Sequence, residues 1–389
     1  MRIALAFFQT QARGGNAANY GFWSDMMRAA LQEAGHEVLE FADIDWAAGM
    51  CPGDGAALRA WRDRSWSLAL QQLEQWRAAG GVDFFLAYFF PHQIEPAAVA
   101  EIRRRGIPIV NFFCDNVREF RHVPTAFRDF DLHWVPEWAA LPLYVQAGLP
   151  HLHAPMPLWI PPGFRSVAAQ EDAATVCFLG TYDPQRAGFL AELAPHGVRV
   201  QIRGKGWQQR DPTPAGFVAR DYAGRLRHQC AFINQHGLAA WLRKFSRTPA
   251  PVYANPPADW CGGPVPRDEY LRLTREAAVT LGINRYESPR LRPGEIAVYS
   301  RLRDIEAPML GACYLTEWAP GLNRLYDLDR EIATYRDAAG LADAAGRLLA
   351  DPARRAAMRS SAQRRALQDH SIAATIGKII RQLGLAAPA

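Results

Sequence analysis

Short, continuously apolar runs alternate with longer amphipathic segments from residue 3 to residue 154. Apolar runs of this length predict strands that are buried on both faces, as in a parallel sheet, and the amphipathic segments predict the helices that cover it. We expect strands at residues 3–8, 36–41, 82–89, 107–113, 132–135 and 151–154, with helices at 20–34, 58–79, 96–105 and 137–147. This order is typical of a doubly wound α/β domain.

The pattern changes after this region. Pro155, Pro157, Pro161, Pro162 and Gly163 lie within nine residues and precede a polar stretch, which predicts a domain linker. The alternation then restarts, with strands expected at 175–179, 198–203, 280–283, 312–316 and 332–335, and helices at 185–193, 267–279, from 297, 341–370 and 372–383. We therefore predict an N-terminal domain (1–158), a C-terminal domain (172–370) and a closing C-terminal helix (371–389). Residues 208–262 interrupt the pattern and are interpreted as an inserted lid or subdomain, with one helix near 226–245.

A doubly wound sheet places its ligand loops at the carboxyl ends of the strands. In the first half these loops are residues 9–19, 90–95 and 114–116, and the first carries Gly14, Gly15 and Asn16, which are candidates for shaping an acceptor site. Two such domains joined by a linker predict one cleft between the carboxyl edges of the two sheets.

Composition narrows the class of protein. The 49% hydrophobic and 21% charged fractions fit a soluble globular chain, and no apolar run approaches the roughly 18 residues of a membrane span. The N-terminus lacks the pattern of a signal peptide, so we expect a cytoplasmic protein. Six cysteines without C-x-x-C spacing are expected to be buried thiols, especially Cys114, Cys177 and Cys313. The net charge of +5 comes with dispersed arginines, so nucleic acid is not an expected partner.

Two loops of the second half are candidate anion sites. Gly180 and Thr181 precede a predicted helix whose N-terminus would favour phosphate, and Arg186 lies one turn later. The alternative is an ordinary turn. Residues 203–207 combine two cations, Arg203 and Lys205, with Gly204 and Gly206, and end in Trp207, which offers a face for stacking. Here the alternative is an exposed turn with a buried tryptophan.

Arg303 and Glu306 are three residues apart and would share one face of a helix. A surface ion pair is the simpler interpretation. Together with the cations above, however, they supply charge for a diphosphate and a carboxylate able to accept two hydrogen bonds from a ribose diol. This combination is typical of a nucleotide-sugar site.

These segments also resemble a known family, the CgeB-like (spore-maturation-type) glycosyltransferases of GT-B fold. The similar segments are residues 303–316, 320–322, 331–335, 341 and 369–371, then 178–186, 204–207 and 281–284, and more weakly 107–115 and 130–132. The resemblance departs at residues 2–19 and at about 208–262. It implies two Rossmann-like domains facing each other across a cleft, with the nucleotide-sugar donor in the C-terminal one. It further implies that Glu306 binds ribose and that Arg186 and Arg303 face the diphosphate, with Lys205 a further candidate.

The resemblance implies no metal cofactor, because GT-B enzymes neutralise the leaving diphosphate with side chains and helix dipoles. An inverting transferase needs a base from the N-terminal domain, and Asp115 and His92 are the candidates. Asp115 is alternatively a helix cap, and His92 a loop hydrogen bonder. We predict transfer from a UDP-, dTDP- or GDP-type donor to a polysaccharide, glycolipid or protein. A nucleotide-sugar epimerase and a non-catalytic nucleotide-sugar or glycan-binding protein remain alternatives.

Overall fold

The computed structural model describes residues 1–7, 21–50, 55–168, 172–208, 229–230, 232–243, 245, 252–292 and 294–386. The chain divides into two compact units. Unit 1 comprises Met1–Asn116, His122–Trp159 and Asp369–Ala389, and unit 2 comprises Val117–Arg121 and Ile160–Gln368. The C-terminal segment, which was expected to follow the second domain as a closing helix, thus belongs to the first unit.

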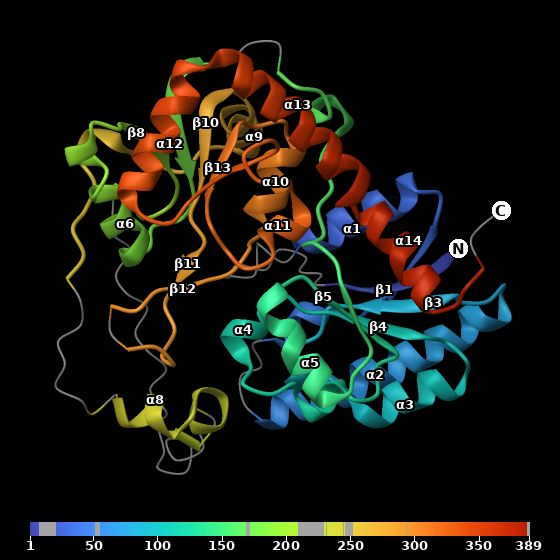
Figure 1. Ribbon diagram of the computed structural model, residues 1–389. Helices are drawn as coiled ribbons and strands as arrows, with labels where there is room; N and C mark the ends of the chain where they lie inside the picture. Colours follow the sequence, from blue (N-terminus) through green and yellow to red (C-terminus); the bar gives the residue numbers. More distant parts are fainter. Residues whose placement is uncertain are drawn as a thin grey trace. The chain divides into compact units, whose positions relative to one another are not determined.

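Unit 1 is built on a six-stranded parallel sheet, as the apolar runs predict (Figure 1). Its strands are β1 (Arg2–Ala6), β2 (Glu37–Glu40), β3 (Phe84–Ala87), β4 (Ile109–Phe112), β5 (Leu132–Val135) and β6 (His151–His153), in the order β2-β1-β3-β4-β5-β6. The helices are α1 (Gly21–Glu33), α2 (Gly55–Ala78), α3 (Pro96–Arg104), α5 (Leu141–Ala147) and α14 (Ile372–Gln382). The short helix α4 (Asn116–Glu119) begins in unit 1 at Asn116, and its other residues belong to unit 2. Because α14 packs on α1, the two ends of unit 1 meet in space.

Unit 2 contains a second six-stranded parallel sheet. Its strands are β7 (Asp172–Leu179), β8 (Val200–Arg203), β9 (Cys261–Gly262), β10 (Ala277–Gly282), β13 (Tyr314–Glu317) and β14 (Ala333–Tyr335), in the order β14-β13-β10-β7-β8-β9. The chain winds outward from β7 in one direction and from β10 in the other. The carboxyl ends of β7 and β10 therefore flank the topological switch point, where ligands bind in open α/β sheets.

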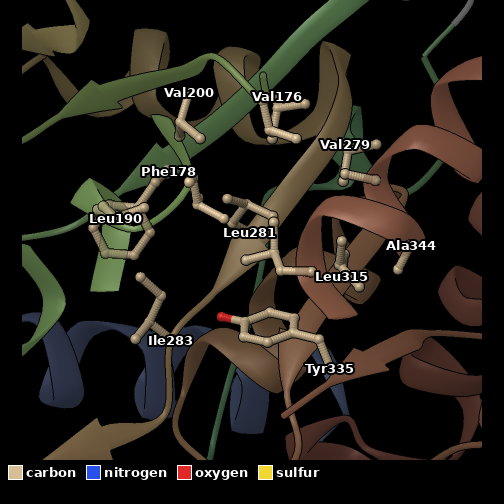
Figure 2. Close-up of a cluster of buried hydrophobic side chains, with 14 of the residues drawn as sticks. Val176, Phe178, Leu190, Val200, Val279, Leu281, Ile283, Leu315, Tyr335 and Ala344 are labelled. Atoms are coloured by element: carbon tan, nitrogen blue, oxygen red, sulfur yellow. The ribbon is translucent and has the colours of Figure 1, made fainter. Parts of the chain in front are cut away.

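Helices cover both faces of the second sheet, which explains why its central strand β10 is buried at every position. The helices of unit 2 include α6 (Pro184–Ala191), α9 (Arg267–Glu276), α10 (Arg303–Met309), α11 (Leu322–Leu325), α12 (Ala338–Ala350) and α13 (Pro352–Asp369). A further helix, α8 (Leu238–Arg243), lies in the region that interrupts the strand–helix alternation. On one face, Val176, Leu281 and Leu315 pack against Leu190 of α6 and Ala344 of α12 (Figure 2). On the other, Cys177 and Leu179 pack against Tyr270 and Leu273 of α9.

Three expected boundaries are wrong. The helix expected at 267–279 ends at Glu276, because the β-branched Val279 and Thr280 belong to β10, which begins at Ala277. The helix expected at 341–370 is two helices, since Pro352 cannot donate to the preceding turn and instead begins α13.

The third boundary concerns the helix expected from residue 297. Residues Ala297–Val298 instead form strand β12, which pairs with β11 (Arg285–Tyr286) in an antiparallel ribbon. The helix α10 starts only at Arg303. The helix expected near 226–245 falls partly outside the described residues. Its described residues 229–230 and 232–236 are helical, and after Gly237, with φ of +92°, the helix α8 follows.

The expectation of buried thiols is confirmed for Cys114, Cys177 and Cys313. Cys230 is free and exposed, Cys261 is free and partly buried, and Cys51 lies outside the described residues. In the part of the chain that the structure describes, no helix is long and apolar enough to cross a membrane.

Candidate functional site

Three arginines gather near the switch point of unit 2. Arg186 lies on α6, which follows β7, while Arg303 is the first residue of α10 and Arg301 lies two residues before that helix. Burial, together with the nearby charges of Arg301 and, less strongly, Arg303, lowers the pKa of the Arg186 guanidinium to about 10. All three remain cations at pH 7, so the fold holds three like charges close together.

Each of the three guanidinium groups is partly fixed by a main-chain oxygen. Arg303 Nη2 donates to Leu179 O at 2.7 Å, Arg301 Nη2 to Arg285 O at 2.9 Å, and Arg186 Nη1 to Thr181 O at 3.4 Å.

Each guanidinium also has a buried nitrogen that makes no hydrogen bond within the described residues: Arg186 Nε, Arg301 Nε and Arg303 Nη1. Of these, Arg303 Nη1 faces a carboxylate, Glu306 Oε2, at 3.4 Å, whereas the described residues offer no partner to the Nε atoms of Arg186 and Arg301. Buried donors are normally satisfied, because an unpaired one costs roughly 1–3 kcal/mol. Two such donors within a group of three cations indicate a site for an anion.

The predicted pairing of Arg303 with Glu306 is confirmed. Arg303 Nη1 lies 3.4 Å from Glu306 Oε2 on α10. Glu306 is only 5% exposed and also accepts a short hydrogen bond from the hydroxyl of Tyr270 on α9. The Arg303 guanidinium stacks over the ring of Tyr270, 4.8 Å from its centroid. The alternative of a surface ion pair is therefore wrong.

The sequence predicts that the N-terminus of α6 is free to bind phosphate, but the protein itself caps this helix end. Asp183 caps the helix by accepting a hydrogen bond from Arg186 N at 3.1 Å, and Pro184 at the first position has no N–H group. The cap therefore occupies the helix end that was expected to receive phosphate. Thr181 and Lys205 are both exposed, so their side chains reach solvent.

The glycines of the two candidate loops are explained by the approach of one loop to the other. At Gly204, with φ of +151°, a Cβ atom would lie 2.0 Å from Gly180 O. At Gly206, with φ of +87°, it would lie 2.9 Å from Tyr182 Cβ. Trp207 is buried and donates from Nε1 to Gly180 O at 2.7 Å. Trp207 therefore does not present an exposed face for stacking, and the alternative of a buried tryptophan is confirmed.

Sequence reasoning gave no role to two buried carboxylates near these arginines. Asp304 is fully buried beside Arg301, and Glu317, at the end of β13, is 3% exposed. Glu317 forms an ion pair with Arg285 at 2.6 Å. Arg301 was also given no role, although it lies two residues before Arg303, just ahead of α10.

The two base candidates lie in unit 1. Asp115 follows β4, and His92 lies in the 3-10 turn Pro91–Gln93 after β3. Because β3 and β4 are neighbouring parallel strands, both residues lie at the same edge of the sheet. Desolvation lowers the pKa of the His92 imidazole, and main-chain hydrogen bonds to Met50 and Gly49 partly oppose this shift.

Other candidates are not placed. Gly14, Gly15 and Asn16 lie outside the described residues. Among the residues that are described, no group of three or more His, Cys, Asp or Glu side chains is arranged to hold a metal ion.

Comparison with known proteins gives a family and a fold. A family model described as "Glycosyl transferase-like" matches residues 186–381. A search of curated protein sequences gave no significant match.

Solved glycosyltransferases have the same fold at low identity. The sucrose-phosphate synthase of Thermosynechococcus elongatus is 16% identical with a TM-score of 0.53, covering 98% of this chain and 99% of its own. A glycosyltransferase of Rickettsia africae is 7% identical with a TM-score of 0.55, covering 98% and 97%. The Anabaena HepE protein in complex with UDP is 14% identical with a TM-score of 0.51, covering 99% and 100%. The two Rossmann-like units thus have the predicted GT-B fold.

Proposed function

Because the chain belongs to the glycosyl transferase-like family, we propose that it transfers a sugar from a nucleoside-diphosphate sugar to a cellular acceptor, with the donor bound by unit 2. The observation that carries the proposal is the group of three neighbouring guanidinium groups on Arg186, Arg301 and Arg303, of which Arg186 and Arg301 each keep a buried Nε without a hydrogen-bond partner among the described residues. A leaving nucleoside diphosphate carries at least two negative charges. It would satisfy these donors and relieve the repulsion between the three cations.

Glu306 is the proposed ligand of the ribose diol. Its carboxylate accepts a hydrogen bond from the Tyr270 hydroxyl and forms an ion pair with Arg303. These two contacts hold the carboxylate in one orientation near the cations. A diol needs acceptors with free lone pairs, and an ionised carboxylate offers about four. The HepE structure, which contains UDP, supports a uridine nucleotide as the first donor to test.

We also propose that the reaction needs no metal ion. Three guanidinium groups can stabilise the negative charge that develops on the leaving diphosphate, which is the task a divalent cation performs in other transferases. Activity should therefore survive EDTA. Loss of turnover in EDTA, restored by Mg²⁺ or Mn²⁺, would contradict this part of the proposal.

We propose that a base on unit 1 removes the proton of the acceptor hydroxyl. Asp115 is the first candidate for this base and His92 is the second. In an inverting reaction this base removes the proton as the hydroxyl attacks the anomeric carbon and the sugar–phosphate bond breaks. Asp115→Asn or His92→Ala should lower kcat at least a hundredfold while leaving nucleotide affinity unchanged. If both variants keep full turnover, neither residue is the base. The class of acceptor is proposed only as a polysaccharide, glycolipid or protein.

A thermal-shift screen against UDP, dTDP, GDP, ADP and CMP tests donor binding. A ligand present at a hundred times its dissociation constant stabilises the folded protein by about 2.7 kcal/mol, so one diphosphate should raise the melting temperature clearly. The selected nucleotide sugar is then incubated with the protein, and products are analysed by mass spectrometry.

The products distinguish the proposal from its alternatives. Release of nucleoside diphosphate supports a transferase. A changed sugar on an intact nucleotide would show an epimerase, and binding without turnover of any donor would show a binding protein. If no nucleotide stabilises the protein, the proposed donor site is wrong.

A further inference from the structure

The carboxylate of Glu317 is saturated by groups of the protein itself. Its Oε1 accepts from Arg285 Nη2 at 2.6 Å and from Nε at 3.1 Å. Its Oε2 accepts from the main-chain N–H groups of Asn284 and Arg285, both at 3.0 Å. Glu317 therefore has little capacity left to bind a ligand. It instead fixes both the side chain and the main chain of the loop that follows β10.

Arg285 is held on a second side as well. Its guanidinium lies over the ring of Phe189 on α6, 3.8 Å from the centroid, and the residue is 6% exposed. The main-chain oxygen of Arg285 accepts the hydrogen bond from Arg301 Nη2 at 2.9 Å. The ion pair between Glu317 and Arg285 thus fixes the oxygen that orients the Arg301 guanidinium.

The main chain of Arg301 is held by Asp304. Arg301 N donates to Asp304 Oδ2 at 3.0 Å. Asp304 also accepts from Tyr314 Oη at 2.8 Å, Thr316 Oγ1 at 2.9 Å and Asn284 Nδ2 at 3.1 Å. Asn284 therefore links the two buried carboxylates, because its N–H group binds Glu317 and its amide binds Asp304.

These hydrogen bonds hold Arg301 in place against the repulsion between its charge and those of Arg186 and Arg303. Arg301 lies near Arg186 and Arg303, and without a fixed partner its long side chain would turn toward solvent, away from the other two cations. The hydrogen bond to Arg285 O and the ring of Tyr299, 4.8 Å from the guanidinium carbon, keep it in place. Its Nε is buried and has no hydrogen-bond partner in the part of the chain that the structure describes.

We infer that Glu317 is a positioning residue: through its ion pair with Arg285 it holds the Arg301 guanidinium ready for the diphosphate of the donor. The inference rests on the proposed function. It assigns a role to a residue that cannot itself contact the nucleotide, and it makes Arg301 the third cation of the site.

Inorganic pyrophosphate is the probe for the test, because it reports on the cation site whatever the nucleobase. Its affinity is measured by calorimetry for the wild type, Glu317→Gln, Arg301→Gln and the double variant. We expect each single substitution to weaken binding about tenfold, and the double variant to bind no more weakly than Arg301→Gln alone. Glu276→Gln is the matched control, since Glu276 pairs with Arg272 at 2.9 Å on α9 in a more exposed position, and it should bind like the wild type.

The outcomes separate the two ideas. If the wild type binds neither pyrophosphate nor any nucleoside diphosphate, the proposed function fails. If the wild type and Glu317→Gln bind pyrophosphate equally, or if the effects of Glu317→Gln and Arg301→Gln are additive, the positioning role is wrong while the donor site stands.

A second variant covers the case in which Glu317→Gln does not fold. Arg285→Lys keeps a positive charge beside Glu317 but loses the two-pronged hydrogen bond. It should weaken pyrophosphate binding about threefold in the wild-type background and not at all in the Arg301→Gln background. An equal loss in both backgrounds would show a general structural effect and overturn the inference.

Discussion

Replacing Arg186 by methionine should stabilise the free protein and weaken its binding of nucleoside diphosphates. The pKa of Arg186 is about 10 instead of 12.5, a difference that corresponds to about 3 kcal/mol of unfavourable environment for the charged form. Arg186 is protonated in both the folded and the unfolded state below pH 10, so this cost is fully present at pH 7. The side chain is partly exposed and also donates to Thr181 O, so we expect a smaller gain of about 1–2 kcal/mol.

The same substitution removes one cation from the proposed diphosphate site. A hydrogen bond to a charged group contributes roughly 1.5–3 kcal/mol, so affinity for the preferred nucleoside diphosphate should fall about tenfold or more. The assay is a pair of measurements on the same sample at pH 7: the melting temperature without ligand, and the dissociation constant by calorimetry. A gain of 1–2 kcal/mol should raise the melting temperature by about 2–8 °C.

Arg199→Met is the control for this prediction. Arg199 is exposed and pairs at 3.3 Å with Asp259 on the surface of the same unit, so its loss should change stability by less than about 0.5 kcal/mol and leave affinity unchanged. If Arg186→Met lowers the melting temperature of the free protein, the three arginines are not in mutual repulsion. If it leaves nucleotide affinity intact, Arg186 does not face the diphosphate.

Three further substitutions test other parts of the structure. Glu306→Gln should weaken binding of the ribonucleotide about tenfold by calorimetry, and much less for its 2′,3′-dideoxy analogue; an equal loss for both would exclude ribose as the ligand. Burial lowers the pKa of His133 from 6.5 to about 4, so the unfolded chain binds more protons between these values and stability falls as the pH falls. Between pH 7 and pH 5, the free energy of unfolding of His133→Gln, measured in urea, should therefore fall by about 2 kcal/mol less than that of the wild type. Parallel pH dependences of the two proteins would contradict this. Gly204→Ala should cost at least about 2 kcal/mol of folding stability because its Cβ would collide with Gly180 O. Gly35 has φ of +79°, and among the described residues no atom beyond its chain neighbours lies within 4 Å of an added Cβ, so Gly35→Ala should cost about 1 kcal/mol. Equal melting temperatures of the two variants would refute the close approach.

The sequence predicts the fold well because the signal for buried parallel strands is local. Residues 84–87 are apolar at every position and residues 109–112 at all but Asn111, and only a sheet covered on both faces buries such runs completely. The pairing of Arg303 with Glu306 is predictable for the same reason, since a helix brings residues three apart together.

The rest of the candidate site depends on contacts between distant segments. Glu317 and Arg285 are 32 residues apart, and nothing in either local sequence indicates their ion pair. The glycines of residues 203–207 suggested room for a ligand, but their neighbour is the loop at Gly180. The helix that starts after Asp183 suggested a phosphate-binding site at its N-terminus. An aspartate at that position, however, is itself a signal for an N-cap.

The central claim is that Arg186, Arg301 and Arg303 bind the diphosphate of the donor. The most direct test is a crystal structure of the protein with the nucleoside diphosphate that gives the largest thermal shift. We predict β-phosphate oxygens within about 3.5 Å of guanidinium nitrogens from all three arginines, with the ribose hydroxyls on Glu306. A nucleotide bound with its diphosphate in contact with none of these arginines would contradict the claim.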